Sequence, residues 1–167
     1  MGTKPSDRKV KVVVRNKKAL HDFEILQKFE AGIVLSGSEV KSIRQGKCSI
    51  QDAYCIFEKK RGKSKRNNLE SLELYVRNLH ISPYQQSNDP KYNPTKERKL
   101  LLHKKELIRL KTAIEQGGLT LIPLSVYFSG PFVKLELALV KGKKKYDKRE
   151  DIKKKDLQRE LSKKVKL

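Results

Sequence analysis

The sequence predicts a mainly β protein: a small closed antiparallel barrel with one main helix, one short helix and a basic C-terminal tail. Three observations support this fold class. Apolar and polar residues alternate in several segments, as they do in half-buried strands. One segment has the periodicity of an amphipathic helix. The last 27 residues carry thirteen Lys or Arg and five Asp or Glu, with few apolar side chains between them.

The first predicted strand lies at residues 21–35, where apolar side chains recur at every second position. It ends at Ser36. Because Ser36 and Glu39 have the spacing of a capping box, we expect a short helix over residues 37–45, which Gly46 terminates.

The middle of the chain contains two further strands and the main helix. Alternation predicts strands at residues 53–57 and 72–81, with a basic loop, residues 59–68, between them. Residues 82–98 contain three prolines, so they should form a long irregular loop. The main helix is expected over His103–Gln116, where His103 stands at the capping position and two glycines follow the last turn.

Two strands close the predicted barrel. Leu119–Phe128 contains Pro123, which indicates an edge strand or a bulge. Phe132–Val140 has the cleanest alternation in the chain, with Lys134 on the outward side, and residues 129–131 form the tight turn before it. Antiparallel strands around one main helix favour a barrel of the oligonucleotide-binding type, the commonest of its kind. We expect it to span residues 12–141, between a basic N-terminal extension (1–11) and the tail (142–167).

Charge indicates the class of partner. The chain of 167 residues has 40 Lys or Arg and 19 Asp or Glu, a formal net charge of +21. Such an excess favours nucleic acid as the partner over an acidic membrane surface. No apolar stretch is long enough to cross a membrane and no secretory signal is present, so we expect a cytoplasmic protein. The tail carries too thin an apolar stripe to be a stable helix alone, so we expect it to fold on binding RNA.

The sequence contains no catalytic or metal-binding signature. The three histidines are scattered, and Cys48 and Cys55 match neither a disulfide framework nor a metal pair, so we expect no enzyme activity, cofactor or metal. Four tyrosines could stack on RNA bases or could equally pack in the core or loops. They are Tyr75, Tyr84, Tyr92 and Tyr127.

Seven short stretches in register resemble the small protein B family, the SsrA-binding proteins of bacteria. They are Asn16–Ala19, Phe29–Ile33, Ser38–Arg44 with Gly46-Lys47, His80–Tyr84, Arg98–His103, Gly118–Thr120, and Lys141–Lys144 running into Tyr146–Arg149. The resemblance covers about residues 12–155. Two features depart from it. The segment Lys60–Ser71 is longer and more basic than the usual family hairpin, and the two cysteines match no family function.

The resemblance implies a function. A family member binds the tRNA-like domain of transfer-messenger RNA (tmRNA) and takes the place of its missing anticodon stem. With alanyl-tmRNA and elongation factor Tu it enters the empty A site of a stalled ribosome, and the nascent chain is then tagged by trans-translation. We expect a monomeric adaptor without catalysis. The alternative is a ribosomal or generic single-stranded RNA-binding barrel protein, and an unrecognised RNA-processing enzyme comes last.

The resemblance also implies residue roles. Asn16 and Glu30 would lie on the RNA-facing side of the barrel, with Glu30 accepting hydrogen bonds from a base edge or a ribose 2′-hydroxyl. Leu101 would shape the binding surface, and Lys134 would contact the RNA backbone.

Tail residues would act at the ribosomal decoding centre, on small-subunit ribosomal RNA. They are Gly142, Lys143, Lys144, Asp147, Lys148 and Arg149. Tyr146 would stack on a ribosomal RNA base, and the remainder of the tail would become helical in the empty mRNA channel.

Overall fold

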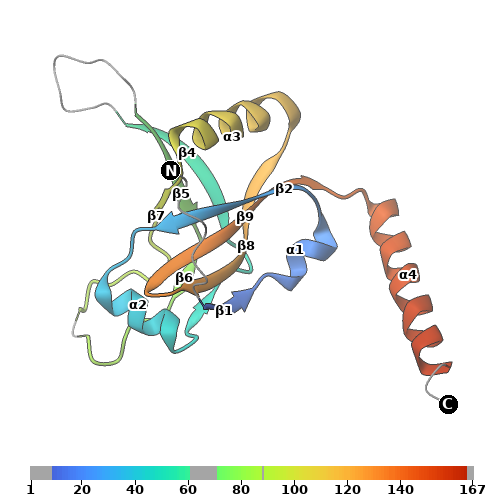
Figure 1. Cartoon of the computed structure of the whole chain (residues 1–167), viewed down its shortest axis with the longest axis horizontal. Coiled ribbons are helices and arrows are strands. Elements are labelled where there is room, and N and C mark those ends of the chain that lie inside the picture. The colour runs from blue at the N-terminus through green and yellow to red at the C-terminus, as the bar shows by residue number, and fades with distance from the viewer. Residues whose placement is uncertain (1–8, 61–70, 88, 165–167) are drawn as a thin grey trace.

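The computed structural model describes residues 9–60, 71–87 and 89–164. Within these ranges the chain forms nine strands and four helices (Figure 1). In chain order they are β1 (Val10–Arg15), α1 (Lys17–Asp22), β2 (Phe23–Ile33), α2 (Gly37–Arg44), β3 (Cys48–Ser49), β4 (Tyr54–Lys60), β5 (Ser71–Arg77), β6 (His80–Ile81), β7 (Arg98–Leu101), α3 (Lys104–Gly117), β8 (Thr120–Ser129), β9 (Phe132–Gly142) and α4 (Lys145–Lys164). Most of the unusual segment Lys60–Ser71 lies outside the described residues.

Six strands form a closed ring. Its order is β8–β4–β5–β7–β2–β9, and β9 pairs again with β8. Every pairing in the ring is antiparallel. Strand β1 is added beside β8, and β3 pairs with β6 in a separate two-stranded sheet. The predicted mainly β fold class is therefore confirmed.

Local sequence signals produce several of these elements as predicted. Helix α2 begins with the expected capping box: the Ser36 hydroxyl accepts from the Glu39 backbone N–H, and the Ser36 N–H donates to the Glu39 carboxylate. Helix α3 begins after His103 and ends at Gly118, which adopts the left-handed conformation. A register shift after Pro123 is the predicted irregularity in β8.

Other elements differ from the prediction. Residues 72–81 are not one strand, because Asn78 takes a positive φ of 57° and divides them into β5 and β6. The predicted loop over residues 82–98 ends in β7, a four-residue strand. Strand β7 pairs with β5 on one side and β2 on the other, so contacts distant in sequence hold it in place.

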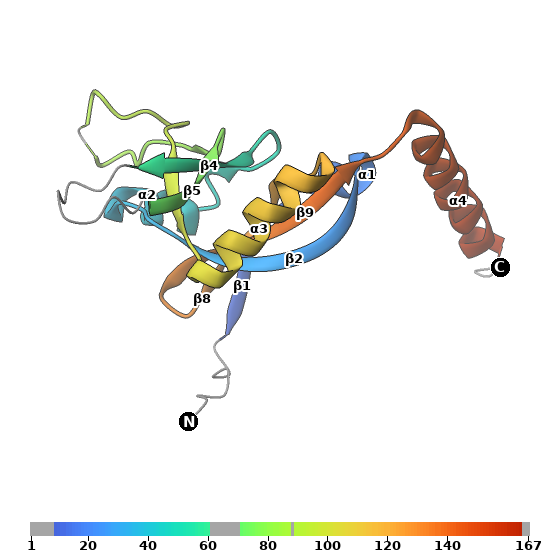
Figure 2. The ribbon, with the colours of Figure 1, turned by 90° about the horizontal axis from the view of Figure 1, so that it is seen from above.

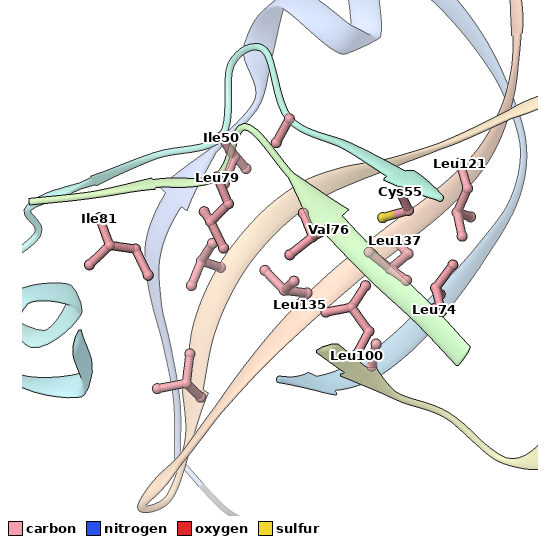
Figure 3. Close-up of a cluster of buried hydrophobic side chains, with 14 of the residues drawn as sticks. Ile50, Cys55, Leu74, Val76, Leu79, Ile81, Leu100, Leu121, Leu135 and Leu137 are labelled. Atoms are coloured by element: carbon pink, nitrogen blue, oxygen red, sulfur yellow. The ribbon is translucent and has the colours of Figure 1, made fainter. Parts of the chain in front are cut away.

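The core fills the ring. Figure 3 shows Leu74, Leu100, Leu121, Leu135 and Leu137 pointing toward one another. They come from β5, β7, β8 and β9, and all of them are buried. Helix α3 covers this cluster with the fully buried Leu110 and, beside it, partly buried apolar residues. Burial of each such leucine contributes about 1.5–3 kcal/mol relative to its exposed state. The core thus holds rigid the strands whose outer faces carry the polar side chains.

Both cysteines pack against this core. Cys55 is buried and Cys48 is half-buried, and both are free thiols. Burial raises the pKa of the Cys48 thiol to about 11, and it raises the pKa of the Cys55 thiol as well.

We expect Cys55 to resist thiol reagents in the folded protein, because the thiolate is the reactive form and this thiol is both buried and protonated. At pH 8, a chromogenic disulfide reagent should titrate two thiols in the guanidinium-unfolded chain and leave Cys55 unmodified in the native one. A Cys48→Ser variant isolates Cys55. Rapid modification of that variant in its native state would contradict the expectation.

Helix α4 projects away from the ring beyond α1 (Figure 2). Its apolar side chains, Ile152, Leu157 and Leu161, are exposed. No helix in the described part of the chain has both the length and the apolar character needed to cross a membrane. That the isolated tail is unfolded stays a prediction, which circular dichroism of a peptide of residues 141–167 would test.

Candidate nucleic-acid interface

Two rows of side chains cross the outer face of the ring and of β1. In the first row, Leu101 pairs with Gly32, Gly32 with Lys134, Lys134 with Tyr127, and Tyr127 with Val12. In the second row, Glu30 pairs with Glu136, Glu136 with Ser125, and Ser125 with Arg15. Because neighbouring residues along each strand point into the core, these two rows lie on the opposite, outer side. We call them together the Glu30 face.

Glu30 organises the centre of this face. The Lys134 ammonium donates to one oxygen of its carboxylate, and the Tyr127 hydroxyl donates to the other. These two hydrogen bonds, that of Lys134 above all, lower the pKa of Glu30. Burial, and after it the Glu30 carboxylate, raises the pKa of Tyr127. At neutral pH Glu30 is therefore ionised, and Tyr127 is a protonated donor.

A second carboxylate, Glu136, repeats the arrangement one strand away. Lys28 Nζ lies 3.3 Å from Glu136 Oε1, and the Ser125 hydroxyl donates to Glu136 Oε2 over 3.4 Å. Positive and negative groups thus alternate across the face. Each lysine is held at its position by a carboxylate rather than extending freely into solvent.

A groove of about 830 Å³ runs along the Glu30 face between β1, α1 and β2. Apolar side chains form part of its wall: Val10, Val12, Leu20, Phe29 and Leu124. Charged and polar side chains form the rest: Arg15, Asn16, Lys17, Lys28, Glu30, Ser125, Tyr127 and Glu136. Cations for phosphate, hydrogen-bonding groups for sugar and base edges, and apolar surface for unstacked bases are the elements of RNA recognition.

Asn16 lies in the wall of this groove and is 6% exposed. Its side-chain NH₂ donates to the backbone carbonyls of Ile50 and Pro123, and its oxygen accepts from the Ala19 N–H as the cap of α1. These bonds fix the start of α1 against β8, so the described contacts of Asn16 position the groove. A direct contact between Asn16 and RNA stays a prediction.

Leu101 extends the Glu30 face onto β7, the strand that pairs with β2. Its side chain is 52% exposed on β7. A Cβ atom on Gly32 would lie 3.3 Å from the Leu101 Cβ. The glycine opposite therefore leaves space for the Leu101 side chain. The structure therefore brings Glu30, Lys134 and Leu101 onto one surface, with Asn16 in the adjoining wall.

The predicted tail residues lie apart from the Glu30 face. Gly142 ends β9, where it pairs with Phe23. Lys143 is paired with Asp151, and Lys148 lies 3.4 Å from Asp22. Arg149 and Lys144 are exposed on the surface. The side chains of Tyr146 and Asp147 lie outside the described residues.

The other three candidate tyrosines have contacts within the protein. Tyr75 is buried, the Tyr92 hydroxyl donates to the Ile81 carbonyl over 2.9 Å, and Lys41 lies 5.3 Å from the centre of the Tyr84 ring.

Lys28 and Glu136 were not among the site residues predicted from the sequence. The alternation of apolar and polar residues in β2 and β9, which placed Lys134 on the outward side, could have identified both. Among the described residues, no three His, Cys, Asp or Glu side chains are grouped to hold a metal ion.

Comparison with known proteins agrees with this picture. The family model of the SmpB protein matches residues 13–167. An SsrA-binding protein of Sulfurihydrogenibium sp. is 47% identical over 156 residues, which are 93% of this chain and 95% of that protein. The SsrA-binding protein of Acetivibrio thermocellus is 49% identical over 156 residues, 93% of this chain and 94% of the relative.

A solved structure is also similar. It is described as "tmRNA-SmpB: a journey to the center of the bacterial ribosome". The matching chain is 44% identical with a TM-score of 0.60, and the match covers 79% of this chain and 85% of that one. Family model, relatives and solved structure agree over most of the length, so the chain belongs to the SmpB protein family.

Proposed function

We propose that this protein binds the tRNA-like domain of tmRNA through the Glu30 face and acts as the adaptor of trans-translation. The observation that carries the proposal is the Glu30 carboxylate, which holds Lys134 and Tyr127 on the outer surface beside a groove. The relatives are named SsrA-binding proteins, and the similar solved structure is described as tmRNA-SmpB on the ribosome. Both support this choice of RNA.

The geometry suggests how the face would recognise RNA. Lys134 is presented to the phosphate backbone at a position fixed by Glu30. An ionised carboxylate has about four lone-pair sites. Lys134 and Tyr127 occupy one on each oxygen, so the remaining sites can accept from a ribose 2′-hydroxyl, a group that DNA lacks. Leu101 and the apolar groove wall would contact bases or sugars displaced from a helix.

The remaining steps of the proposal concern the ribosome. The ring, bound to the tRNA-like domain, would replace the absent anticodon stem and reach the A site with alanyl-tmRNA and elongation factor Tu. The tail, residues 142–167, would then contact small-subunit ribosomal RNA at the decoding centre and the empty mRNA channel. In this role the protein is a monomeric cytoplasmic adaptor that performs no catalysis.

A binding comparison tests the choice of RNA. At near-physiological salt, the full-length protein should bind the isolated tRNA-like domain far more tightly than an unrelated RNA of equal length. Equal affinities would support the alternative, a generic single-stranded RNA-binding protein. Cleavage or modification of RNA by the purified protein, lost on a single substitution, would support an enzyme instead.

Two substitutions should separate the roles of Lys134 and Tyr127. Lys134→Met should weaken binding to the tRNA-like domain and flatten the log–log salt dependence by roughly 0.7–0.9, because one phosphate contact is lost. Tyr127→Phe removes only the hydrogen bond to Glu30, so it should weaken binding while the salt dependence keeps its slope. Lys105→Met, at an exposed position of α3 away from the Glu30 face, is the control. Equal salt slopes for the Lys134 and Lys105 variants would contradict the assignment.

A further inference from the structure

The arrangement of Glu30 with a lysine and a tyrosine recurs on β5 and β7. The Lys99 ammonium donates to one oxygen of the Glu73 carboxylate over 2.7 Å, and the Tyr75 hydroxyl donates to the other oxygen. A lysine and a tyrosine thus hold the two oxygens of one carboxylate, as they do at Glu30. We call Lys99, Glu73 and Tyr75 the Lys99 cluster.

Strand register joins this cluster to the Glu30 face. Figure 3 shows Leu74 and Leu100 pointing into the core, so the residues next to them on β5 and β7 point outward. These two leucines form a pair, which places Glu73 beside Leu101, the end of the first row of the Glu30 face. The Lys99 cluster therefore continues that face across β7 onto β5.

Apolar side chains occupy the surface between Lys99 and Lys134. Val34 is as exposed as Leu101, and its N–H donates to the Lys99 carbonyl over 3.0 Å. Phe132, two positions before Lys134 on β9, shares its outward side and is also more than half exposed. We call Val34, Leu101 and Phe132 the apolar patch. Exposed apolar side chains grouped within a charged surface are typical of a binding site.

The lysines at the margin of the apolar patch indicate its ligand. Lys134 and Lys99 are separated by two strands and two residues, so their Cα atoms are roughly 12 Å apart. Two ammonium groups at this separation can bind different phosphates of one RNA, while the apolar surface between them contacts bases or sugars. Because the patch is continuous with the Glu30 face, the same RNA covers both.

We propose that Lys99 is a second phosphate-binding lysine for the tRNA-like domain, that Glu73 is its positioning residue, and that the apolar patch contacts unstacked bases between Lys99 and Lys134. The inference rests on the proposed function and extends its binding surface to β5 and β7. Since Glu73 already restricts the Lys99 side chain in the free protein, less conformational entropy is lost when phosphate binds.

Salt titrations of binding to the tRNA-like domain test the phosphate contact. In the full-length chain, Lys99→Met should weaken affinity about fivefold and flatten the log–log salt dependence by roughly 0.7–0.9. Combined with Lys134→Met, it should flatten the dependence by roughly 1.4–1.8. Lys111→Met is the matched control, because Lys111 Nζ lies 3.6 Å from Glu115 on α3 and its side chain is as exposed as that of Lys134. Equal slopes for the Lys99 and Lys111 variants would overturn the inference.

A double-mutant cycle tests the role of Glu73. Glu73→Gln keeps the shape of the side chain and removes the charge that holds Lys99. It should weaken binding in the native background, because Lys99 loses its fixed position. In the Lys99→Met background it should strengthen binding, because only the repulsion between carboxylate and phosphate is removed. Equal strengthening in both backgrounds would show that Glu73 merely repels RNA and does not position Lys99.

Val34→Ser tests the apolar patch. It should weaken affinity for the tRNA-like domain about threefold, since apolar contact area is lost, while the salt dependence keeps its slope. Ile108→Ser is the control, because Ile108 of α3 is as exposed as Val34. Equal affinities of the two variants would contradict a contact between the patch and RNA.

These measurements separate the inference from the proposed function. If the native protein prefers the tRNA-like domain and Lys134→Met flattens the salt dependence, but Lys99→Met does not, the proposed function stands and the inference is wrong. If the native protein binds an unrelated RNA of equal length as tightly, the proposed function fails, and the ligand assigned to Lys99 fails with it.

Discussion

Replacing Arg98 with methionine should remove roughly 3–5 kcal/mol from the free energy of unfolding. Arg98 and Glu39 are each 2% exposed, and Arg98 Nε lies 2.8 Å from Glu39 Oε1. The guanidinium also donates to the carbonyls of Leu79 and Pro94 and to the Tyr92 hydroxyl. The substitution leaves the buried Glu39 charge without its buried partner and several acceptors without a donor.

Urea unfolding at pH 7, analysed as a two-state transition, gives the measurement. The matched control is Arg77→Met, because the pairs of Arg77 with Glu58 and Glu97 are partly exposed. The control should cost far less than Arg98→Met, because exposed ion pairs contribute little to stability. Similar losses in both variants would show that the buried cluster contributes no more than a surface pair.

Acid should weaken the same cluster. Burial raises the pKa of Glu39. The hydrogen bonds from the Ser36 N–H and the Arg98 guanidinium together lower it by more than burial raises it, so the pKa of Glu39 is below its ordinary value. Because the pKa of Glu39 is lower in the folded than in the unfolded protein, its ionised form stabilises the fold. This stabilisation is complete above the unfolded-state pKa, about 4.3 for Glu, and is lost as the pH falls through the folded-state pKa. The difference in stability between native and Arg98→Met proteins should therefore shrink below about pH 4.

This buried cluster shows why part of the fold could not be predicted. The capping box of α2 and the alternation of β2 and β9 are local patterns, and the sequence alone predicts them. Arg98 stands at the end of a segment rich in proline, where a loop is the local expectation. Its burial depends on Glu39, 59 residues earlier, and on carbonyls of the loop itself. Short strands such as β7 depend in the same way on partners that no local pattern identifies.

The Glu30 face has the same limitation. Glu30, Lys134 and Leu101 were predicted because the sequence resembles a family, and alternation placed Lys134 outward. The hydrogen bonds of Glu30 join residues 97 and 104 positions apart, so they follow from strand register, which the sequence did not reveal. Register also explains why Tyr127, rather than Tyr75, Tyr84 or Tyr92, lies at the Glu30 carboxylate.

Removing the tail after Gly142 should abolish peptide tagging on stalled ribosomes while leaving affinity for the tRNA-like domain within about twofold of the native value. Strand β9 runs to Gly142, which pairs with Phe23, so this boundary keeps the whole ladder between β2 and β9. The Glu30 face lies nearer the other end of those strands and loses none of its residues. Tagging should fail because the proposed contacts of Lys143, Lys144, Lys148 and Arg149 with ribosomal RNA are all removed.

The two readouts require separate measurements on one truncated protein. Binding to the tRNA-like domain is measured by titration, and tagging by adding tmRNA and the protein to ribosomes stalled on a truncated message. The matched control is the full-length chain with Glu30→Ala, which should show the opposite pattern. Its affinity for the tRNA-like domain should be weak, but tagging should recover when the protein is added in excess. If truncation weakened binding as much as Glu30→Ala does, the tail would be part of the tmRNA site, and the division between a ring that binds tmRNA and a tail that acts on the ribosome would be wrong.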